Sequence, residues 1–225
     1  MEESARRSRL FDTIPQQLWE AEGGHLLASQ TDTERSNMKQ AESKGTVGNA
    51  AVLSDIPSLR KRARQNIEAG AVTKGYAADR DTVITLLNGA LATELVCVLR
   101  YKRHYFMAKG IHSEPVKAEF LEHANEEMAH ADMLAKRIIE LGGAPNFSPD
   151  GLAARSHAEY VEGDSLGAMI KEDLVAERIA IESYREMIAY LAGNDPTTQH
   201  MLKQILASEE EHADDLASLL AGMTP

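Results

Sequence analysis

The sequence predicts an all-α protein in which two antiparallel helical hairpins, joined by one long crossover, form a four-helix bundle. Three observations support this fold class. Apolar residues recur every three or four positions in four long stretches after residue 80, as on one face of an α-helix. The breaks within the first and second pairs of stretches are short, whereas the middle break spans residues 142–163. A link of that length suits a crossover that runs along a bundle.

Residues 1–78 are predicted to form a largely flexible N-terminal arm, partly disordered and separate from the bundle. Glycines, prolines and a polar run over residues 29–48 interrupt any helical period there. Two short amphipathic helices are expected within the arm, over residues 10–19 and 57–69. The second carries a local excess of basic residues on a chain whose formal net charge is −11: Arg60, Lys61, Arg62 and Arg64.

The bundle is predicted to occupy residues 79–225, with helices over residues 80–109, 113–141, 164–193 and 196–221. Gly110 and the pair Gly142-Gly143 are typical of residues that end helices. Asp195 is expected to cap the last helix, because Pro196 follows it at the first helical position.

The composition narrows the location and the chemistry of the protein. The single cysteine, Cys97, excludes an internal disulfide and a four-cysteine metal module, so a reducing compartment, the cytoplasm, is predicted. The acidic net charge argues against nucleic-acid binding by the whole surface. No stretch is expected to reach a membrane-spanning length, and no signal peptide is expected at the start of the chain.

The pattern Glu-x-x-His-Ala-Asp occurs twice, beginning at Glu127 and at Glu209. A glutamate and a histidine three positions apart lie on one face of a helix, so both side chains can hold the same metal ion. Each of these glutamates also continues an apolar helical stripe, which predicts that the pair faces the core.

Two more glutamates, Glu94 and Glu177, lie in the middle of apolar stripes, and each is followed seven residues later by a tyrosine. Burial of a carboxylate is costly unless a partner compensates its charge. The spacing from the lone glutamate to the motif glutamate is nearly the same in both halves, which indicates two similar hairpins. We therefore expect six side chains around one point: Glu94, Glu127, His130, Glu177, Glu209 and His212.

Charge and ligand type indicate which ions such a cluster would hold. Two divalent cations balance four carboxylates, and oxygen donors with one imidazole per ion favour Fe(II) or Mn(II). One glutamate from each of two helices, plus Glu-x-x-His from the other two, is typical of di-iron bundles. Asp173 is expected to accept a hydrogen bond from a ligand histidine. Tyr101 and Tyr184 are interpreted as hydrogen-bond donors or electron donors to the centre, or as ordinary core residues. The other histidines receive no role: His104, His112, His123, His157 and His200.

The chain resembles bacterioferritins and the Dps-like mini-ferritins of the ferritin-like superfamily. The resemblance lies in residues 87–96, 122–132, 142–146, 173–177 and 209–212. It implies a ferroxidase in which Fe(II) is oxidised by O₂ or H₂O₂ and the ferric mineral is stored in a hollow homo-oligomeric shell. It also assigns the ligands: Glu94 and Glu177 as terminal ligands, Glu127 and Glu209 as bridging ligands, and His130 and His212 as the imidazoles.

Two departures from the bacterioferritin pattern, and one further match to it at Met128, affect these expectations. The sequence has no room after His212 for the fifth helix of bacterioferritins, so a shell of 12 subunits is favoured over one of 24. Met128 stands where bacterioferritins have a haem-ligating methionine, which suggests haem b at a two-fold interface, or else a surface methionine. The long arm is more similar to the variable tails of Dps proteins, some of which hold DNA.

Three functions therefore stay open from the sequence. The favoured one is a ferroxidase that stores or detoxifies iron. The second is a manganese catalase or di-iron oxidase that uses the same ligands without storage. The third is a Dps-type protein that binds DNA through its arm and protects it during oxidative stress, with binding that weakens steeply with salt.

Overall fold

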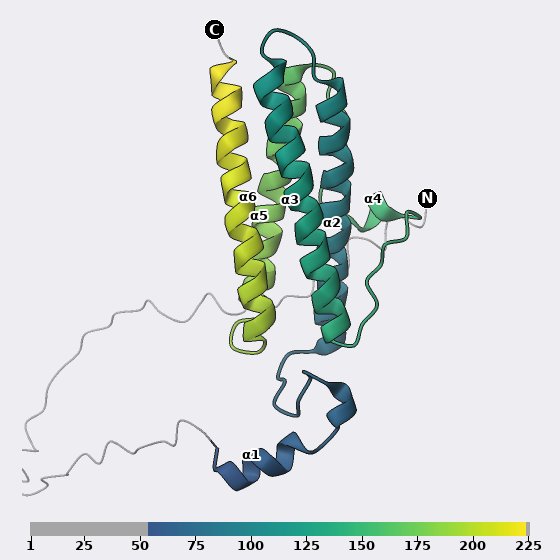
Figure 1. Cartoon of the computed structure of the whole chain (residues 1–225), viewed down its shortest axis with the longest axis vertical. Coiled ribbons are helices and arrows are strands. Elements are labelled where there is room, and N and C mark those ends of the chain that lie inside the picture. Colours follow the sequence, from purple (N-terminus) through teal and green to yellow (C-terminus); the bar gives the residue numbers. More distant parts are fainter. Residues whose placement is uncertain (1–53, 224–225) are drawn as a thin grey trace, which may run out of the picture. The chain divides into compact units, whose positions relative to one another are not determined.

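The computed structural model describes residues 54–223, in which every regular element is a helix. Four long helices make the bundle: α2 (Arg80–Met107), α3 (Ser113–Glu140), α5 (Leu166–Tyr190) and α6 (Pro196–Gly222) (Figure 1). Two short helices, α1 (Ile56–Ala63) and α4 (Leu152–Arg155), and a 3₁₀ turn, η2 (Ile67–Ala69), complete the described part. The predicted all-α fold class is confirmed.

The long helices pair as two hairpins, with α2 against α3 and α5 against α6, as the short links predicted. Their ends agree with the sequence to within a few residues. At the start of α5, the Ser165 side chain caps the helix by accepting a hydrogen bond from the Ala168 amide. Asp195 caps α6 in the expected way, since its side chain accepts from the Thr198 amide.

The crossover between α3 and α5 follows α2 along its length, and three hydrogen bonds record its path. The Asn146 amide donates to Asn88 Oδ1 (2.7 Å), the His157 amide to Thr93 Oγ1 (2.9 Å), and Arg100 Nη1 to the Glu159 carbonyl (2.8 Å). The short helix α4 in this segment was not expected. At four residues it is too short to show a helical period in the sequence.

The bundle core consists of two apolar clusters separated by a polar layer. One cluster includes Leu87, Leu134 and Leu202, and the other includes Phe120 and Ile170. The glutamates and histidines of the predicted cluster follow one set of these residues and precede the other on each helix. Both sides of the polar layer are therefore shielded from water by close packing.

Helix α2 corrects the expectation that no stretch of the chain reaches a membrane-spanning length. Among the described helices, it alone contains an 18-residue window that meets the length and hydropathy of a membrane span, with a mean hydropathy of 1.8. In the bundle, 56% of that window is buried. The apolar composition of α2 is thus accounted for by packing against the neighbouring helices.

The described end of the arm forms α1 and η2 in place of the single helix expected over residues 57–69. The Asp55 side chain caps α1, and the positive φ of Asn66 (51°) interrupts the helical path before η2. Val72 and Tyr76 then pack against the first apolar cluster. The helix expected over residues 10–19 lies outside the described residues, and the boundary at residue 78 stays a prediction.

Candidate metal centre

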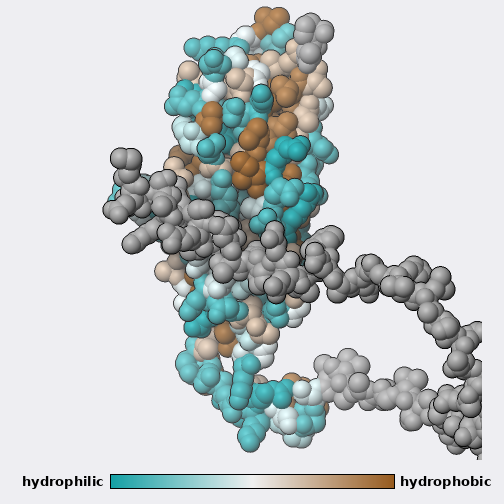
Figure 2. All heavy atoms as spheres, turned by 180° about the vertical axis from the view of Figure 1, so that it is seen from behind, coloured by the Kyte–Doolittle hydropathy of each residue, from teal (hydrophilic) through white to brown (hydrophobic). Residues whose placement is uncertain are grey.

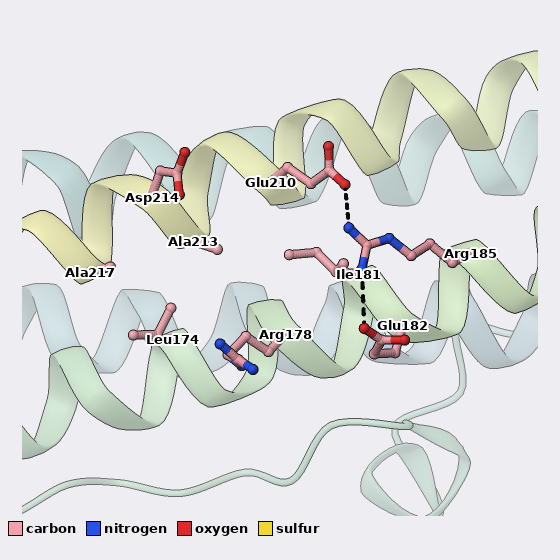
Figure 3. Close-up of a pocket in the computed structure, with 9 residues that line it drawn as sticks. All are labelled: Leu174, Arg178, Ile181, Glu182, Arg185, Glu210, Ala213, Asp214 and Ala217. Atoms are coloured by element: carbon pink, nitrogen blue, oxygen red, sulfur yellow. Dashed lines mark hydrogen bonds and ion pairs between the residues drawn. The ribbon is translucent and has the colours of Figure 1, made fainter.

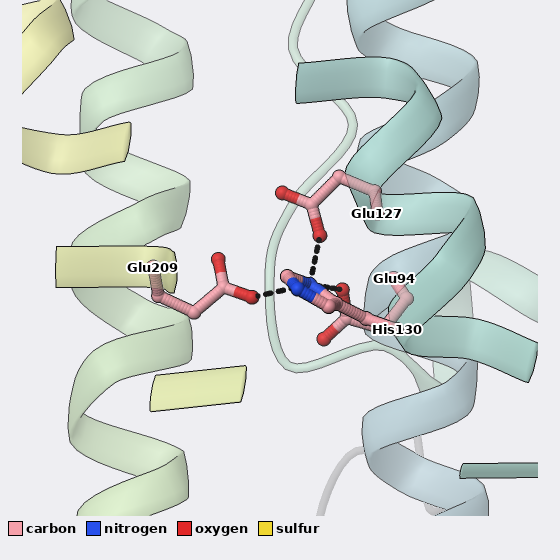
Figure 4. Close-up of side chains that lie close together, drawn as sticks. All are labelled: Glu94, Glu127, His130 and Glu209. Carbon is pink, nitrogen blue, oxygen red and sulfur yellow. Dashed lines mark ion pairs between the residues drawn. The ribbon is translucent and has the colours of Figure 1, made fainter. Parts of the chain in front are cut away.

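The structure brings the six predicted side chains together in the polar layer of the bundle. Helix α2 contributes one glutamate, α5 contributes one, and α3 and α6 each contribute a glutamate and a histidine. All six are buried, with exposed fractions between 0% and 6%. Figure 4 shows four of them, Glu94, Glu127, His130 and Glu209, with their polar ends directed at one another.

The six residues form two groups that share two glutamates. The first group is Glu94, Glu127, His130 and Glu209, and the second is Glu127, Glu177, Glu209 and His212. Within each group, one ligand atom per residue lies within 4.8 Å of all the others. Glu127 and Glu209 belong to both groups, which is the arrangement that two ions bridged by two carboxylates require.

In the first group, distances from the His130 imidazole define the donor atoms. Its Nδ1 lies 3.6 Å from Glu94 Oε2, 3.5 Å from Glu127 Oε2 and 3.0 Å from Glu209 Oε1. Donors that each bind one ion at about 2.1 Å are separated by roughly 3.0–3.5 Å. The first group therefore has the dimensions of a ligand set around one ion.

In the second group, the same role falls to His212. Its Nδ1 lies 3.5 Å from Glu127 Oε1, 3.9 Å from Glu177 Oε2 and 3.8 Å from Glu209 Oε2. Each shared glutamate thus gives one oxygen to each group, and each unshared glutamate gives one oxygen to one group. The result is two sets of four donors.

These donor atoms have no other partners. Ten buried side-chain atoms in the described residues lack a hydrogen bond, and eight of them belong to the six cluster residues. The eight are Glu94 Oε2, both oxygens of Glu127, His130 Nδ1, Glu177 Oε2, both oxygens of Glu209, and His212 Nδ1. A buried polar atom without a partner costs about 1–3 kcal/mol. Two divalent cations would satisfy all eight and balance four carboxylate charges, so the residues fit a di-metal centre.

The pKa values of most cluster residues move toward the protonated form. Burial and the charge of Glu127 raise the pKa of Glu94 well above its usual value, and burial with neighbouring carboxylates raises that of Glu209 to about 8. Burial alone would lower the pKa of His130, but its contacts with three carboxylates raise it to about 12. These residues therefore attract positive charge.

The pKa of Glu177 moves in the opposite direction. Burial raises its pKa, yet its contacts with His212 and Glu209 and a hydrogen bond from a tyrosine together lower it to about 2. Its carboxylate therefore carries a negative charge within the cluster.

Two tyrosines hold the outer oxygens of the unshared glutamates. The Tyr101 hydroxyl on α2 donates to Glu177 Oε1 on α5, and the Tyr184 hydroxyl on α5 donates to Glu94 Oε1 on α2. Burial raises the pKa of both phenols well above its usual value, which keeps them protonated as donors. The other oxygen of each glutamate, Oε2, is left to face the centre.

Asp173 does not bind a ligand histidine, so that expectation is corrected. Its Oδ1 accepts from Arg100 Nε (2.7 Å), and its Oδ2 lies 2.7 Å from His104 Nδ1. The other ring nitrogen of His104 lies 2.9 Å from the Glu162 carbonyl. The buried guanidinium of Arg100 requires an anion, and Asp173 is in reach of it. These residues fix the crossover to the bundle instead of orienting the metal ligands.

Glu126 and His123 contact the centre, although the sequence pattern predicted a role for neither residue. Glu126 Oε2 lies 2.6 Å from His212 Nε2 and thereby takes the place expected of Asp173. The ring of His123 stacks on the ring of His212 with centroids 4.1 Å apart. Its position four residues before Glu127, on the same face of α3, was the available signal.

Met128 is directed away from the centre and is 40% exposed on α3. The step of one residue from Glu127 predicted this orientation. Haem at this position stays a prediction.

A surface groove of about 470 Å³ lies between α5 and α6 (Figure 3). Arg185 spans it by pairing with Glu182 and Glu210 at 3.1 Å and 2.7 Å. None of the six cluster residues lines this groove. It is therefore separate from the candidate centre.

Comparisons with known proteins agree with the fold. The model of the ferritin-like domain matches residues 84–224. Bacterioferritin of Rhodobacter capsulatus is 29% identical over 141 residues, which cover 62% of this chain and 83% of the relative. The DNA protection during starvation protein of Pyrococcus furiosus is 33% identical over 148 residues, covering 64% and 80%.

A solved structure gives the same result. The dodecameric thioferritin of Bacteroides fragilis, a bacterioferritin-related protein, superposes with a TM-score of 0.63 and is 34% identical. The match covers 65% of this chain and 89% of that structure. The chain therefore belongs to the ferritin-like family.

Proposed function

We propose that this protein is a ferroxidase that oxidises Fe(II) at an intrasubunit di-iron centre. The observation that carries the proposal is the set of eight buried, partnerless donor atoms, divided into two groups of four that share Glu127 and Glu209. Three oxygens and one imidazole nitrogen per ion suit Fe(II), with Mn(II) as the alternative.

In this proposal each side chain has a defined task. Glu127 and Glu209 hold two Fe(II) ions close together, and His130 and His212 each complete one ligand set. The tyrosines fix the unshared glutamates so that a single oxygen of each faces the ions. A bound pair of Fe(II) ions supplies two electrons, which with two protons reduce O₂ to H₂O₂ or H₂O₂ to two waters.

We further propose that the protein stores iron in a homo-oligomeric shell, with 12 subunits favoured over 24. The dodecameric thioferritin supports this assembly. Figure 2 shows apolar residues among polar ones on one face of the bundle. Large apolar side chains of the described residues that are more than half exposed in the subunit include Leu99 (54%), Phe106 (75%) and Ile111 (93%). Contact with further subunits would remove such surface from water.

The proposal is tested by an anaerobic Fe(II) titration followed by addition of O₂ or H₂O₂. We expect the centre to bind two Fe(II) per subunit and to oxidise both when the oxidant is added. Glu209→Gln should abolish the binding of this pair and its oxidation, because it removes a charge that both ions share. Glu210→Gln is the matched control, since Glu210 is adjacent but exposed and paired with Arg185.

Either of two results would contradict the proposal. One is wild-type protein that binds no more than one Fe(II) per subunit and oxidises none. The other is a Glu209→Gln variant that behaves like Glu210→Gln. Activity without a shell and without mineral growth would favour a manganese catalase or a di-iron oxidase instead.

A second candidate function is Dps-type protection of DNA through α1. Its basic residues Arg60, Lys61 and Arg62 are exposed, and the Pyrococcus furiosus relative is named for DNA protection. Such binding should lose affinity steeply with salt, by a slope of about −0.9 per phosphate contact in a double-logarithmic plot. Gel shifts that are unchanged after replacement of these three residues by glutamine would refute the role of α1.

A further inference from the structure

A third group of potential ligands lies beside the di-metal centre, toward the surface. Glu119 and His123 on α3 and Asp215 on α6 place one ligand atom each within 4.8 Å of one another. The side chains of Glu119 and Asp215 are 36% and 51% exposed, whereas that of His123 is only 2% exposed. The group therefore joins a buried imidazole to two carboxylates that reach solvent.

The His123 imidazole is directed at these carboxylates without bonding to either. Its Nε2 lies 3.7 Å from Glu119 Oε2 and 4.0 Å from Asp215 Oδ2, and it is buried with no hydrogen-bond partner. Apart from the eight atoms of the di-metal centre, few buried side-chain nitrogen or oxygen atoms of the described residues lack a hydrogen-bond partner. A partnerless nitrogen in a buried ring calls for a physical account.

The opposite ring nitrogen fixes the protonation of His123. Its Nδ1 lies 3.3 Å from the Tyr101 hydroxyl, which donates its own proton to Glu177. The Tyr101 oxygen is therefore available as an acceptor, and His123 Nδ1 is the donor. This tautomer leaves a lone pair on Nε2, facing two carboxylates that offer no proton. A divalent cation between them would satisfy all three groups.

We propose that Glu119, His123 and Asp215 form a third metal site, which binds a divalent first-row transition ion. The inference rests on the proposed function only in naming Fe(II) as the physiological ion and in giving the site a transit role toward the di-metal centre. One neutral imidazole and two carboxylates balance a single divalent charge, and the exposure of both carboxylates leaves room for water ligands.

The position of this site links it to the di-metal centre. His123 stacks on His212, and a hydrogen-bonded path runs from His123 through Tyr101 to Glu177, so two ligands of the second ion group are involved. The third site is thus one side chain away from the buried centre and open to solvent on its other side. This arrangement suits a transit site through which Fe(II) passes between solvent and centre.

The test counts ions with Co(II), a probe that needs no oxidation step, in anaerobic titrations of the full-length protein. Wild-type protein should bind three Co(II) per subunit. The double variant Glu119→Gln/Asp215→Asn should bind two, with the affinity for the third ion reduced on the order of 10–100-fold or more. Asp214→Asn is the matched control and should still bind three, because Asp214 is adjacent but lines the groove between α5 and α6.

Glu209→Gln separates the two proposals. If both proposals hold, this variant loses the two Co(II) of the buried pair and keeps the Co(II) of the third site. The double variant, in contrast, loses the Co(II) of the third site and keeps the pair. A wild-type count of two that is unchanged in the double variant overturns the third site and leaves the di-metal centre intact. A count of one that disappears in the double variant and persists in Glu209→Gln overturns the di-metal centre and supports the third site.

Discussion

At the scale of single residues, the tyrosines decide how the buried glutamates present their oxygens. Each phenol lies in one hairpin and donates to the glutamate of the other, Tyr101 to Glu177 and Tyr184 to Glu94. A carboxylate held at one oxygen cannot rotate freely, so the remaining oxygen is positioned before an ion arrives. Such positioning lowers the cost of ordering the ligands at the moment of binding.

Removal of one phenol tests this role. Tyr184→Phe leaves Glu94 Oε1 buried without its donor, so the free energy of unfolding of the metal-free protein should fall by about 1–3 kcal/mol in urea titrations. The Fe(II) or Co(II) held by the first group, which contains Glu94, should also bind more weakly. Tyr190→Phe is the control, because Tyr190 is 47% exposed and should change neither quantity. Equal behaviour of the two variants would show that the hydrogen bond does not matter.

The six cluster residues were predictable from the sequence because their signal is periodic. A Glu-x-x-His pair at helical spacing on an apolar stripe has few interpretations other than a metal-binding pair that faces the core. Its repeat in both halves of the chain makes those other interpretations fewer still. Glu126 and His123 lacked that regularity, since nothing in the other hairpin repeats them. Their roles depend on which helix packs opposite. That information is tertiary, and it also explains why Asp173 was assigned to the wrong partner.

At the scale of elements, caps and glycines predicted the ends of the long helices, while the crossover was predictable only in length. Its path along α2 depends on buried contacts such as those of Arg100 and His104 with Asp173 and with crossover carbonyls. No local sequence pattern predicts such contacts. The N-cap of α6 is the opposite case, because Asp195 and Pro196 specify it locally.

Asp195 also makes the stability of the bundle depend on pH. Burial raises its pKa, but hydrogen bonds from Thr198 and Tyr76 and the nearby Arg137 outweigh that effect, so its pKa lies below the usual 3.8. A carboxylate whose pKa is lowered by folding stabilises the fold above its unfolded pKa, and this contribution disappears as the pH falls through the folded pKa.

The charge of Asp195 can be removed while its capping role is kept. Asparagine is an equally good N-cap, so Asp195→Asn keeps the cap and removes the charge, together with the second oxygen that accepts from Tyr76 and the Thr198 hydroxyl. In urea titrations across the acid range, wild-type protein should be more stable than the variant near neutral pH, and the difference should shrink below pH 3.8. A difference that stays constant over this range would mean that Asp195 does not carry a lowered pKa.

At the scale of the whole molecule, the two hairpins are near repeats that build one centre. Each supplies a lone glutamate, a Glu-x-x-His pair and a tyrosine, and neither can complete an ion site alone, because every group of four donors draws on both. Folding of the bundle and formation of the centre are therefore linked, so bound ions should stabilise the fold. The arrangement within a subunit does not by itself require a shell. The exposed apolar side chains give the separate reason for assembly.

Assembly is checked by the native mass of the intact particle. Twelve subunits amount to 12 × 24.7 kDa, or about 296 kDa, against 24 × 24.7 kDa, or about 593 kDa. We expect the smaller mass, since the match with the dodecameric thioferritin covers 89% of that structure. Iron added beyond the ions that the protein binds should then sediment with the particle as a mineral, and Glu209→Gln particles of the same mass should accumulate little. A monomer or dimer that oxidises iron without retaining it would separate the chemistry of the centre from storage, because a bundle without a cavity has no place to hold the product.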